Sequence, residues 1–144
     1  AAKGELTVTL EQSCPATPGQ PHKEPFHIPL MMGLLDKAGN ELTLDCDKIT
    51  VNSDGKNLME LKETKEVFTF KGLKDRPVLS VLREFSAPVN LKWEASAEDL
   101  YFLMEKDTDS FNRREMAQKI SLRLLHNLIG SNRTSITQRF ASLK

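Results

Sequence analysis

The hydrophobic pattern of the chain changes its period close to Trp93. Upstream of this residue, apolar and polar residues alternate in short runs separated by turn residues, which is typical of antiparallel strands. From Ser96 onward, apolar residues recur at helical spacing. Pro88 favours the end of the sheet between the two patterns, because a residue that precedes proline avoids the helical region. The change predicts a β domain over residues 1–93 and a helical domain over residues 94–144.

The upstream part predicts an antiparallel sandwich. Strands are expected in its alternating or apolar segments, which are residues 5–12, 26–36, 41–46, 67–70 and 77–89, and a further short strand is expected within residues 48–57. Segment 26–36 is apolar at nearly every position and fits a strand covered on both faces. Its Pro29 lacks an amide donor and is expected near the strand start or on an edge. Turn signals recur about every 8–12 residues, and no interval is long enough for a crossover helix between parallel strands.

A first helix is expected to begin at Ser96. The Ser96 hydroxyl can cap the first turn, and Asp99, three residues on, faces the positive end of the helix dipole. Residues 100–104 are apolar around the whole circumference, so this helix is expected to be buried between layers. Large apolar side chains near the change of pattern are expected to be buried at the interface between the two domains. The residues expected to pack at this junction are Phe85, Trp93, Leu100, Phe102, Leu103 and Met104.

Two more helices are expected downstream. Residues 109–132 have apolar residues at helical spacing, with Asp109 or Ser110 as the cap and Gly130 as the C-terminal stop. Residues 132–144 predict the start of a third helix. Its spaced apolar residues are Ile136, Phe140 and Leu143. A helical array generally needs three or more repeats to close its core. We therefore expect the helical part of the chain to pack against the sandwich or to be the beginning of a larger array. We therefore interpret the chain as a fragment.

The composition argues against two classes of partner. Twenty Lys and Arg residues balance twenty Asp and Glu residues, and no basic cluster stands out, so nucleic-acid binding is not expected. The longest apolar run, "IPLMMGLL" at residues 28–35, is far shorter than the roughly 20 residues that a membrane span requires. No membrane partner is therefore expected.

No catalytic constellation is recognisable in the sequence. The HExxH, GxSxG, Walker and GxGxxG motifs are all missing, and the three histidines are expected to have structural or solvent-exposed roles. Cys14 and Cys46 do not form a CxxC pair, and no histidine lies at metal-ligand spacing from them. The sequence leaves open whether the two cysteines pair. Our interpretation is two free thiols in a reducing compartment, which favours the cytoplasm.

Several segments together resemble a known family. They are "CPATPGQPHKEPFHIPL" (14–30), "LLDKAGNELTL" (34–44), "LREFSAPVNLKW" (82–93) and "LYFLMEKDTDSFNRREMAQK" (100–119). In order and spacing they are similar to the post-catalytic region of the aminopeptidase N, or alanyl aminopeptidase, family of gluzincin zinc metallopeptidases. The resemblance extends from about Leu6 to Ile129 and is most specific at "PATPGQ", "FHIPL" and "REFSAPV".

The resemblance implies an immunoglobulin-like β-sandwich followed by the first helices of an α-superhelical, armadillo/HEAT-like domain. The implied zinc belongs to the catalytic domain of the parent enzyme, and no position here matches a family zinc ligand or catalytic glutamate. The implied partners are the remaining domains of the parent, which alone would bind peptide substrates. In the family an extended segment precedes Gly4. Its absence would leave one sheet edge unpaired, which implies self-association of the fragment.

These observations lead to a functional hypothesis with two alternatives. The hypothesis is a non-catalytic spacer and cap-support region of a zinc aminopeptidase that removes N-terminal amino acids from peptides. The first alternative is an independent immunoglobulin-like protein-interaction module with residues 14–25 as its recognition loop. The second is a thiol enzyme that uses Cys14 or Cys46.

Overall fold

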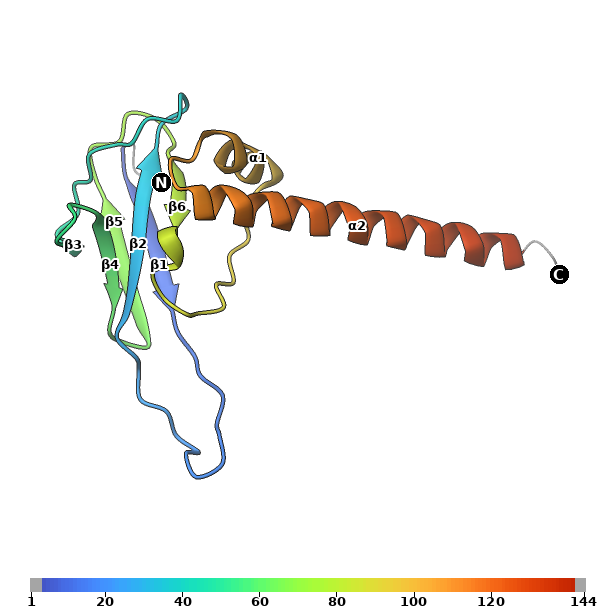
Figure 1. Ribbon diagram of the computed structural model, residues 1–144, viewed down its shortest axis with the longest axis horizontal. Helices are drawn as coiled ribbons and strands as arrows, with labels where there is room; N and C mark the ends of the chain where they lie inside the picture. The colour runs from blue at the N-terminus through green and yellow to red at the C-terminus, as the bar shows by residue number, and fades with distance from the viewer. Residues whose placement is uncertain (1–3, 142–144) are drawn as a thin grey trace.

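Two antiparallel sheets precede two helices in the computed structural model, which describes the backbone of residues 4–141 and the side chains of residues 4–130 (Figure 1). The strands are β1 (Leu6–Glu11), β2 (Ile28–Leu35), β3 (Ile49–Val51), β4 (Asn57–Leu61), β5 (Lys65–Phe70) and β6 (Val78–Val81). A short 3-10 turn, η1 (Arg83–Phe85), leads to α1 (Ala97–Lys106) and α2 (Ser110–Ala141). One sheet has the order β1-β5 and the other the order β3-β4-β2-β6.

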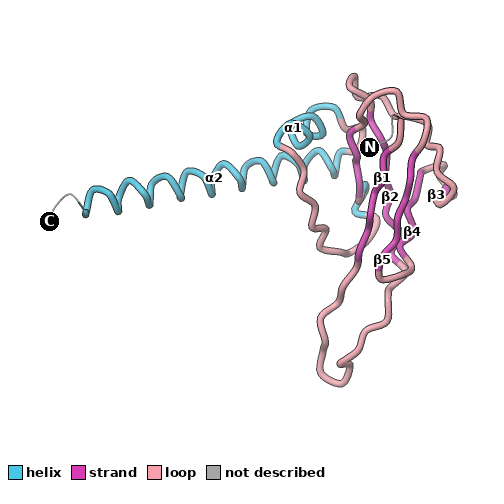
Figure 2. The backbone as a smooth tube through the Cα atoms, turned by 180° about the vertical axis from the view of Figure 1, so that it is seen from behind, coloured by secondary structure: helices cyan, strands magenta, loops and turns pink. Residues whose placement is uncertain are grey.

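The core of the sandwich lies between the two sheets. Phe68 and Phe70 of β5 are fully buried there against Leu34 of β2 and Met59 of β4. Strand β1 alternates half-buried and exposed residues, as its sequence pattern predicts. Long loops connect the strands, and the loop between β1 and β2 extends well beyond both sheets (Figure 2).

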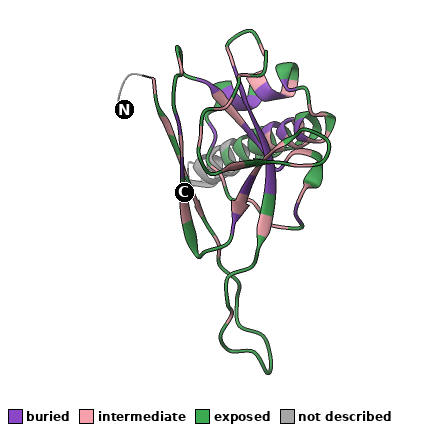
Figure 3. Cartoon of the chain, turned by 90° about the vertical axis from the view of Figure 1, so that its left-hand side faces the viewer, coloured by how far each residue is buried: buried purple, intermediate pink, exposed green. Residues whose placement is uncertain are grey.

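Strand β2 is the centre of the fold because it is covered on both faces, as predicted. From Leu30 to Leu35 every residue is buried, and Pro29 lies near the strand start, as predicted. The alternation of side chains divides the strand between two cores. Leu30, Met32 and Leu34 face the sandwich, whereas Leu35 faces the helices. Figure 3 shows the buried residues gathered along the sheet and the adjoining helices.

Three expectations for the strands need correction. Residues 41–46 do not form a strand: Glu41 makes one isolated bridge to Leu35, and the Leu42 amide donates to the Leu34 carbonyl at 2.8 Å. The alternation there reflects partial burial against the core without a hydrogen-bonded ladder. The sequence predicts one strand around residues 67–70, whereas the structure has two in this region, β4 and β5. The strand expected over 77–89 ends at Val81, because the chain enters η1 with Leu82 in a left-handed conformation.

The first helix begins where predicted but is less buried. The Ser96 hydroxyl accepts the Asp99 amide at 3.0 Å and caps α1. Leu100 and Leu103 are buried on one face of the helix, whereas Tyr101 is 47% exposed. The prediction that α1 is buried around its whole circumference is therefore wrong, because only one side of the helix meets the sandwich and α2.

The second helix is longer than predicted. The Asp109 carboxylate accepts the Asn112 amide at 2.7 Å and caps α2, which is one of the two caps expected. The helix then continues through Gly130 to Ala141, so the predicted stop and the predicted third helix are wrong. Glycine inside a helix costs only about 1 kcal/mol, which a long helix tolerates. Ile136 and Phe140 belong to this same helix, and Leu143 lies outside the described residues.

The far part of α2 extends away from the sheets (Figure 1). Its apolar side chains Leu124, Leu125 and Ile129 are each more than half exposed. Of the helices in the described part of the chain, none has the length and apolar character needed to cross a membrane.

Candidate functional site

The junction between the sandwich and the helices has an apolar core of its own. Buried there are Leu35 of β2, Leu100 and Leu103 of α1, and Met116 and Ile120 of α2. These side chains come from three elements, so their burial holds α1 and α2 against the face of β2 that the sandwich core does not use.

The structure places the six residues predicted at the junction in different surroundings. Leu100 and Leu103 lie in the junction core, and Phe102 and Met104 pack against it while partly buried. Trp93 packs against both the junction core and the sandwich core, and the Lys119 ammonium lies 5.7 Å from the centre of its ring. Phe85 is 51% exposed and lies 5.5 Å from the ring of Phe111 at the start of α2.

Next to the apolar core lies a buried polar cluster, formed by Ser80, Arg83, Asp107 and Asn112. The Ser80 hydroxyl donates to the Asp107 carboxylate at 2.6 Å and accepts from the Arg83 Nε and the Asn112 Nδ2, each at 2.7 Å. The side-chain amide of Asn112, through the same Nδ2, also donates to the Asp107 carboxylate at 2.9 Å. No buried side-chain nitrogen or oxygen within the described side chains lacks a hydrogen-bond partner. Every buried polar atom of the cluster therefore has a hydrogen-bond partner, and these hydrogen bonds offset the cost of removing the cluster from water.

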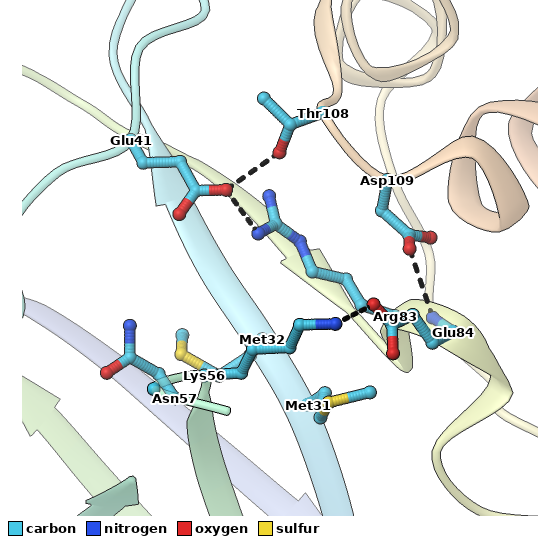
Figure 4. A pocket seen from close by; sticks show the side chains of 10 residues that line it. Met31, Met32, Glu41, Lys56, Asn57, Arg83, Glu84, Thr108 and Asp109 are labelled. Carbon is cyan, nitrogen blue, oxygen red and sulfur yellow. Dashed lines mark hydrogen bonds and ion pairs between the residues drawn. The ribbon is translucent and has the colours of Figure 1, made fainter. Parts of the chain in front are cut away.

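Arg83 connects three segments of the chain through its guanidinium group. Its Nη2 donates to Asp107 at 3.1 Å, and its Nη1 donates to Glu41 at 2.5 Å. The Thr108 hydroxyl donates to the same Glu41 oxygen at 2.7 Å (Figure 4). Burial alone raises the pKa of Glu41, but the hydrogen bonds from Thr108 and Arg83 outweigh burial and hold this pKa below its usual value.

Gly33 provides the space that the guanidinium occupies. A Cβ atom at this position would lie 2.6 Å from the Arg83 Cζ, closer than any side chain could come. Gly33 is paired with Ser80 across the ladder between β2 and β6, so the two residues lie side by side on one sheet face. Two small residues at the centre of two buried strands thus make room for one arginine.

The turn that carries Arg83 has an unusual backbone. Leu82, Glu84 and Phe85 have φ values of 62°, 54° and 52°, a region that non-glycine residues seldom adopt. The Glu84 amide donates to the Asp109 carboxylate at 3.2 Å, and the Glu84 carboxylate forms an ion pair with Lys56 (Figure 4). The turn is therefore held by contacts on both of its sides, including one to the cap of α2.

A cavity of about 310 Å³ with a mixed polar and apolar lining lies beside this turn. Four of its charged lining groups form ion pairs, Lys56 with Glu84 and Arg83 with Glu41, and Asp109 accepts the Glu84 amide. Over the described residues, no group of three or more His, Cys, Asp or Glu side chains could hold a metal ion. Cys14 and Cys46 are both free thiols.

A second ion pair joins the sandwich to α1 near the surface. The Arg76 guanidinium donates to both oxygens of Asp99, at 2.9 and 2.7 Å, and these hydrogen bonds lower the pKa of Asp99 despite its burial. The Arg76 side chain is 71% exposed, so water weakens the pair.

We expect Asp99→Asn to lower the free energy of unfolding by about 1 kcal/mol near neutral pH. A lowered folded-state pKa contributes stability above the unfolded-state value of about 4, and this stability is lost as pH falls through the folded-state pKa. The difference between wild type and variant should therefore shrink as pH falls below about 4 and through the lowered folded-state pKa of Asp99. Urea titrations across this range measure it, and a difference that does not change with pH would contradict the assignment.

Sequence reasoning did not find the polar cluster. Ser80, Arg83, Asp107 and Asn112 were not among its candidates, although Arg83 lies inside residues 82–93 and both Asp107 and Asn112 lie inside residues 100–119, two of the segments that resemble the family. The available signal was a glycine and a serine in the middle of two apolar strands, at Gly33 and Ser80.

The fold and the junction define an immunoglobulin-like sandwich that continues into a helical-repeat segment. The chain belongs to the family described as a domain of unknown function with an Ig-like fold (DUF3458), whose model matches residues 1–94. A second model, DUF3458_C, described as ARM repeats, matches residues 97–143. The predicted fold class is therefore confirmed.

Comparison with known proteins confirms the resemblance to aminopeptidase N. The chain is 35% identical to aminopeptidase N of Escherichia coli over 116 residues, which cover 81% of this chain and 13% of that protein. It is 32% identical to aminopeptidase N of Haemophilus influenzae over 113 residues, which cover 78% of this chain and 12% of that protein.

A solved structure is also similar. Legionella pneumophila aminopeptidase A, in complex with aspartic acid, matches with a TM-score of 0.66 and 30% identity, over 87% of this chain and 12% of that chain. The chain thus spans a small part of each relative, and this part resembles the non-catalytic domains of aminopeptidase N.

Proposed function

We propose that this chain is the non-catalytic spacer and cap-support region of a zinc aminopeptidase that removes N-terminal amino acids from peptides. The observation that carries the proposal is the junction. An apolar core packs α1 and α2 against β2, and a satisfied polar cluster ties the segment between the two helices to β6 and η1. A rigid connection is what a supporting domain needs, because a small misplacement at a distant active site costs rate.

Packing against the remaining domains of the parent enzyme is part of the same proposal. Leu124, Leu125 and Ile129 present apolar surface on α2, beyond the sandwich. The helical segment matches a family model of ARM repeats, in which successive helices stack on one another. We propose that these side chains pack against further repeats of the parent's helical domain.

The zinc ion of the proposed enzyme is assigned to another part of the parent. The described residues offer no cluster of metal-ligating side chains, so they do not fit a zinc site, and no step of peptide hydrolysis is assigned to them. The junction residues predicted from sequence, Trp93, Leu100 and Leu103 among them, have a supporting role in the proposal. The free thiols Cys14 and Cys46 suit a reducing compartment, and we propose the cytoplasm.

The proposal is tested with the isolated chain and with a chimera. The isolated chain is expected to release no amino acid from aminoacyl-anilide substrates, with or without added zinc. A chimera in which this chain replaces the matched 116-residue segment of the E. coli relative is expected to keep most of that enzyme's activity. Replacement by an unrelated immunoglobulin-like sandwich is the control, and we expect it to lower kcat/KM by about 100-fold or more.

Two results would contradict the proposal. The first is zinc-dependent turnover by the pure isolated chain. The second is a folded chimera no more active than the enzyme with the unrelated sandwich, which would favour an independent interaction module.

A further inference from the structure

The apolar core of the junction does not by itself select one docking angle. Hydrophobic attraction among Leu35, Leu100, Leu103 and Met116 is non-directional, so it favours their burial without specifying how α1 and α2 are oriented on the sheet. Hydrogen bonds, in contrast, weaken steeply when their angles change. An element that fixes the angle must therefore be polar and must contact both parts of the chain.

Arg83 meets both conditions. Its planar guanidinium contacts Ser80 on β6, Glu41 after β2 and Asp107 before α2, each through a different nitrogen. Since the donors of the guanidinium form a rigid fork, a rotation of the helices that moves Asp107 breaks at least one of the three contacts. The side chain is 11% exposed, so water has little access to replace a lost contact.

The backbone around Arg83 ties the same group to the position of α2. The left-handed residues Glu84 and Phe85 contact Asp109 and Phe111, which lie at the start of α2. A strained turn persists only where its surroundings enforce it. Docking of α2 therefore supports the turn, and the turn presents Arg83 to Asp107.

We propose that Arg83, seated over Gly33, is a positioning residue that gives α1 and α2 a single docking angle on the sandwich. The inference goes beyond the proposed function because it concerns the geometry of this chain alone. Its test does not use peptidase activity, so a failure of the test would leave the spacer proposal standing, and a failed chimera would leave this inference standing.

The test measures a distance between the sandwich and α2 by double electron–electron resonance. The full chain carries serine at both native cysteines and spin labels at Thr64→Cys and Asn127→Cys, both of which are exposed positions. We expect one narrow distance distribution for the parent chain. Arg83→Lys keeps the charge but lacks the fork, and we expect it to broaden or split the distribution while circular dichroism shows a folded chain.

The matched control is Arg76→Lys. Arg76 also joins the sandwich to a helix through two hydrogen bonds, but its side chain is largely exposed. We expect its distribution to keep the single narrow peak. A single narrow peak for Arg83→Lys would show that a positive charge at this position suffices, and it would overturn the inference.

A second variant keeps the test decisive if Arg83→Lys does not fold. Gly33→Ala leaves Arg83 in place but puts a methyl group where the guanidinium lies, and we expect it to broaden the distribution in the same way. Gly130→Ala is its control, because an added Cβ there meets no atom of the described residues within 4 Å. A narrow, unshifted peak in folded Gly33→Ala would overturn the inference.

Discussion

Replacing Arg83 by methionine is expected to lower the free energy of unfolding by about 3–5 kcal/mol. Methionine preserves most of the volume of the arginine stem but removes the positive charge. The Asp107 side chain is fully buried, so its carboxylate loses the counter-charge while water cannot reach it. Urea denaturation at neutral pH, followed by far-UV circular dichroism, measures the loss.

The control for this substitution is Arg76→Met, which removes the other arginine between the sandwich and the helices. Because Arg76 is mostly exposed, we expect a loss within about 1 kcal/mol. A loss of less than about 1 kcal/mol for Arg83→Met as well would show that burial of Asp107 does not depend on the guanidinium.

Trp93→Ala is expected to lower the free energy of unfolding by about 3 kcal/mol. The indole ring is partly buried and packs against the sandwich core and the junction core at once, so its removal exposes apolar surface of both cores. Because Trp93 is the only tryptophan, unfolding of the variant has to be followed by circular dichroism.

Tyr101→Ala is a suitable control for Trp93→Ala. Tyr101 is also aromatic and lies close to the junction on α1, but it is 47% exposed, and its loss should cost within about 0.5 kcal/mol. If Trp93→Ala and Tyr101→Ala were equally mild, the ring of Trp93 would not link the two cores.

The fold could be predicted where local pattern decides the structure. Alternation placed β1, continuous apolar character marked β2 as covered on both faces, and the hydroxyl of Ser96 marked the start of α1. Local pattern gave wrong predictions where a contact between distant segments decided the structure, and where the local preference of a residue was weak. Residues 41–46 alternate but join no ladder, and Gly130 is accommodated inside α2.

The candidate site was predicted only in its apolar part. Leu100 and Leu103 could be found because a helix with a capped start and apolar residues needs a surface to cover. The polar cluster could not, because Arg83 meets partners 42 and 24 residues away in the sequence, and no local rule pairs them. Gly33 and Ser80 mark its place only once their strands are known to be neighbours.

Strand β2 serves two cores, and this changes the meaning of the domain boundary. The switch near Trp93 separates two kinds of secondary structure, but β2 contributes buried side chains both to the sandwich core and to the core that it shares with the helices. Excision of the helices would uncover Leu35 and leave Arg83 with Glu41 as a carboxylate partner but without Asp107, so the remaining sandwich would display an apolar strand face beside an incomplete polar cluster. The boundary near Trp93 therefore marks a change of secondary structure, and the buried contacts that stabilise the fold extend across it.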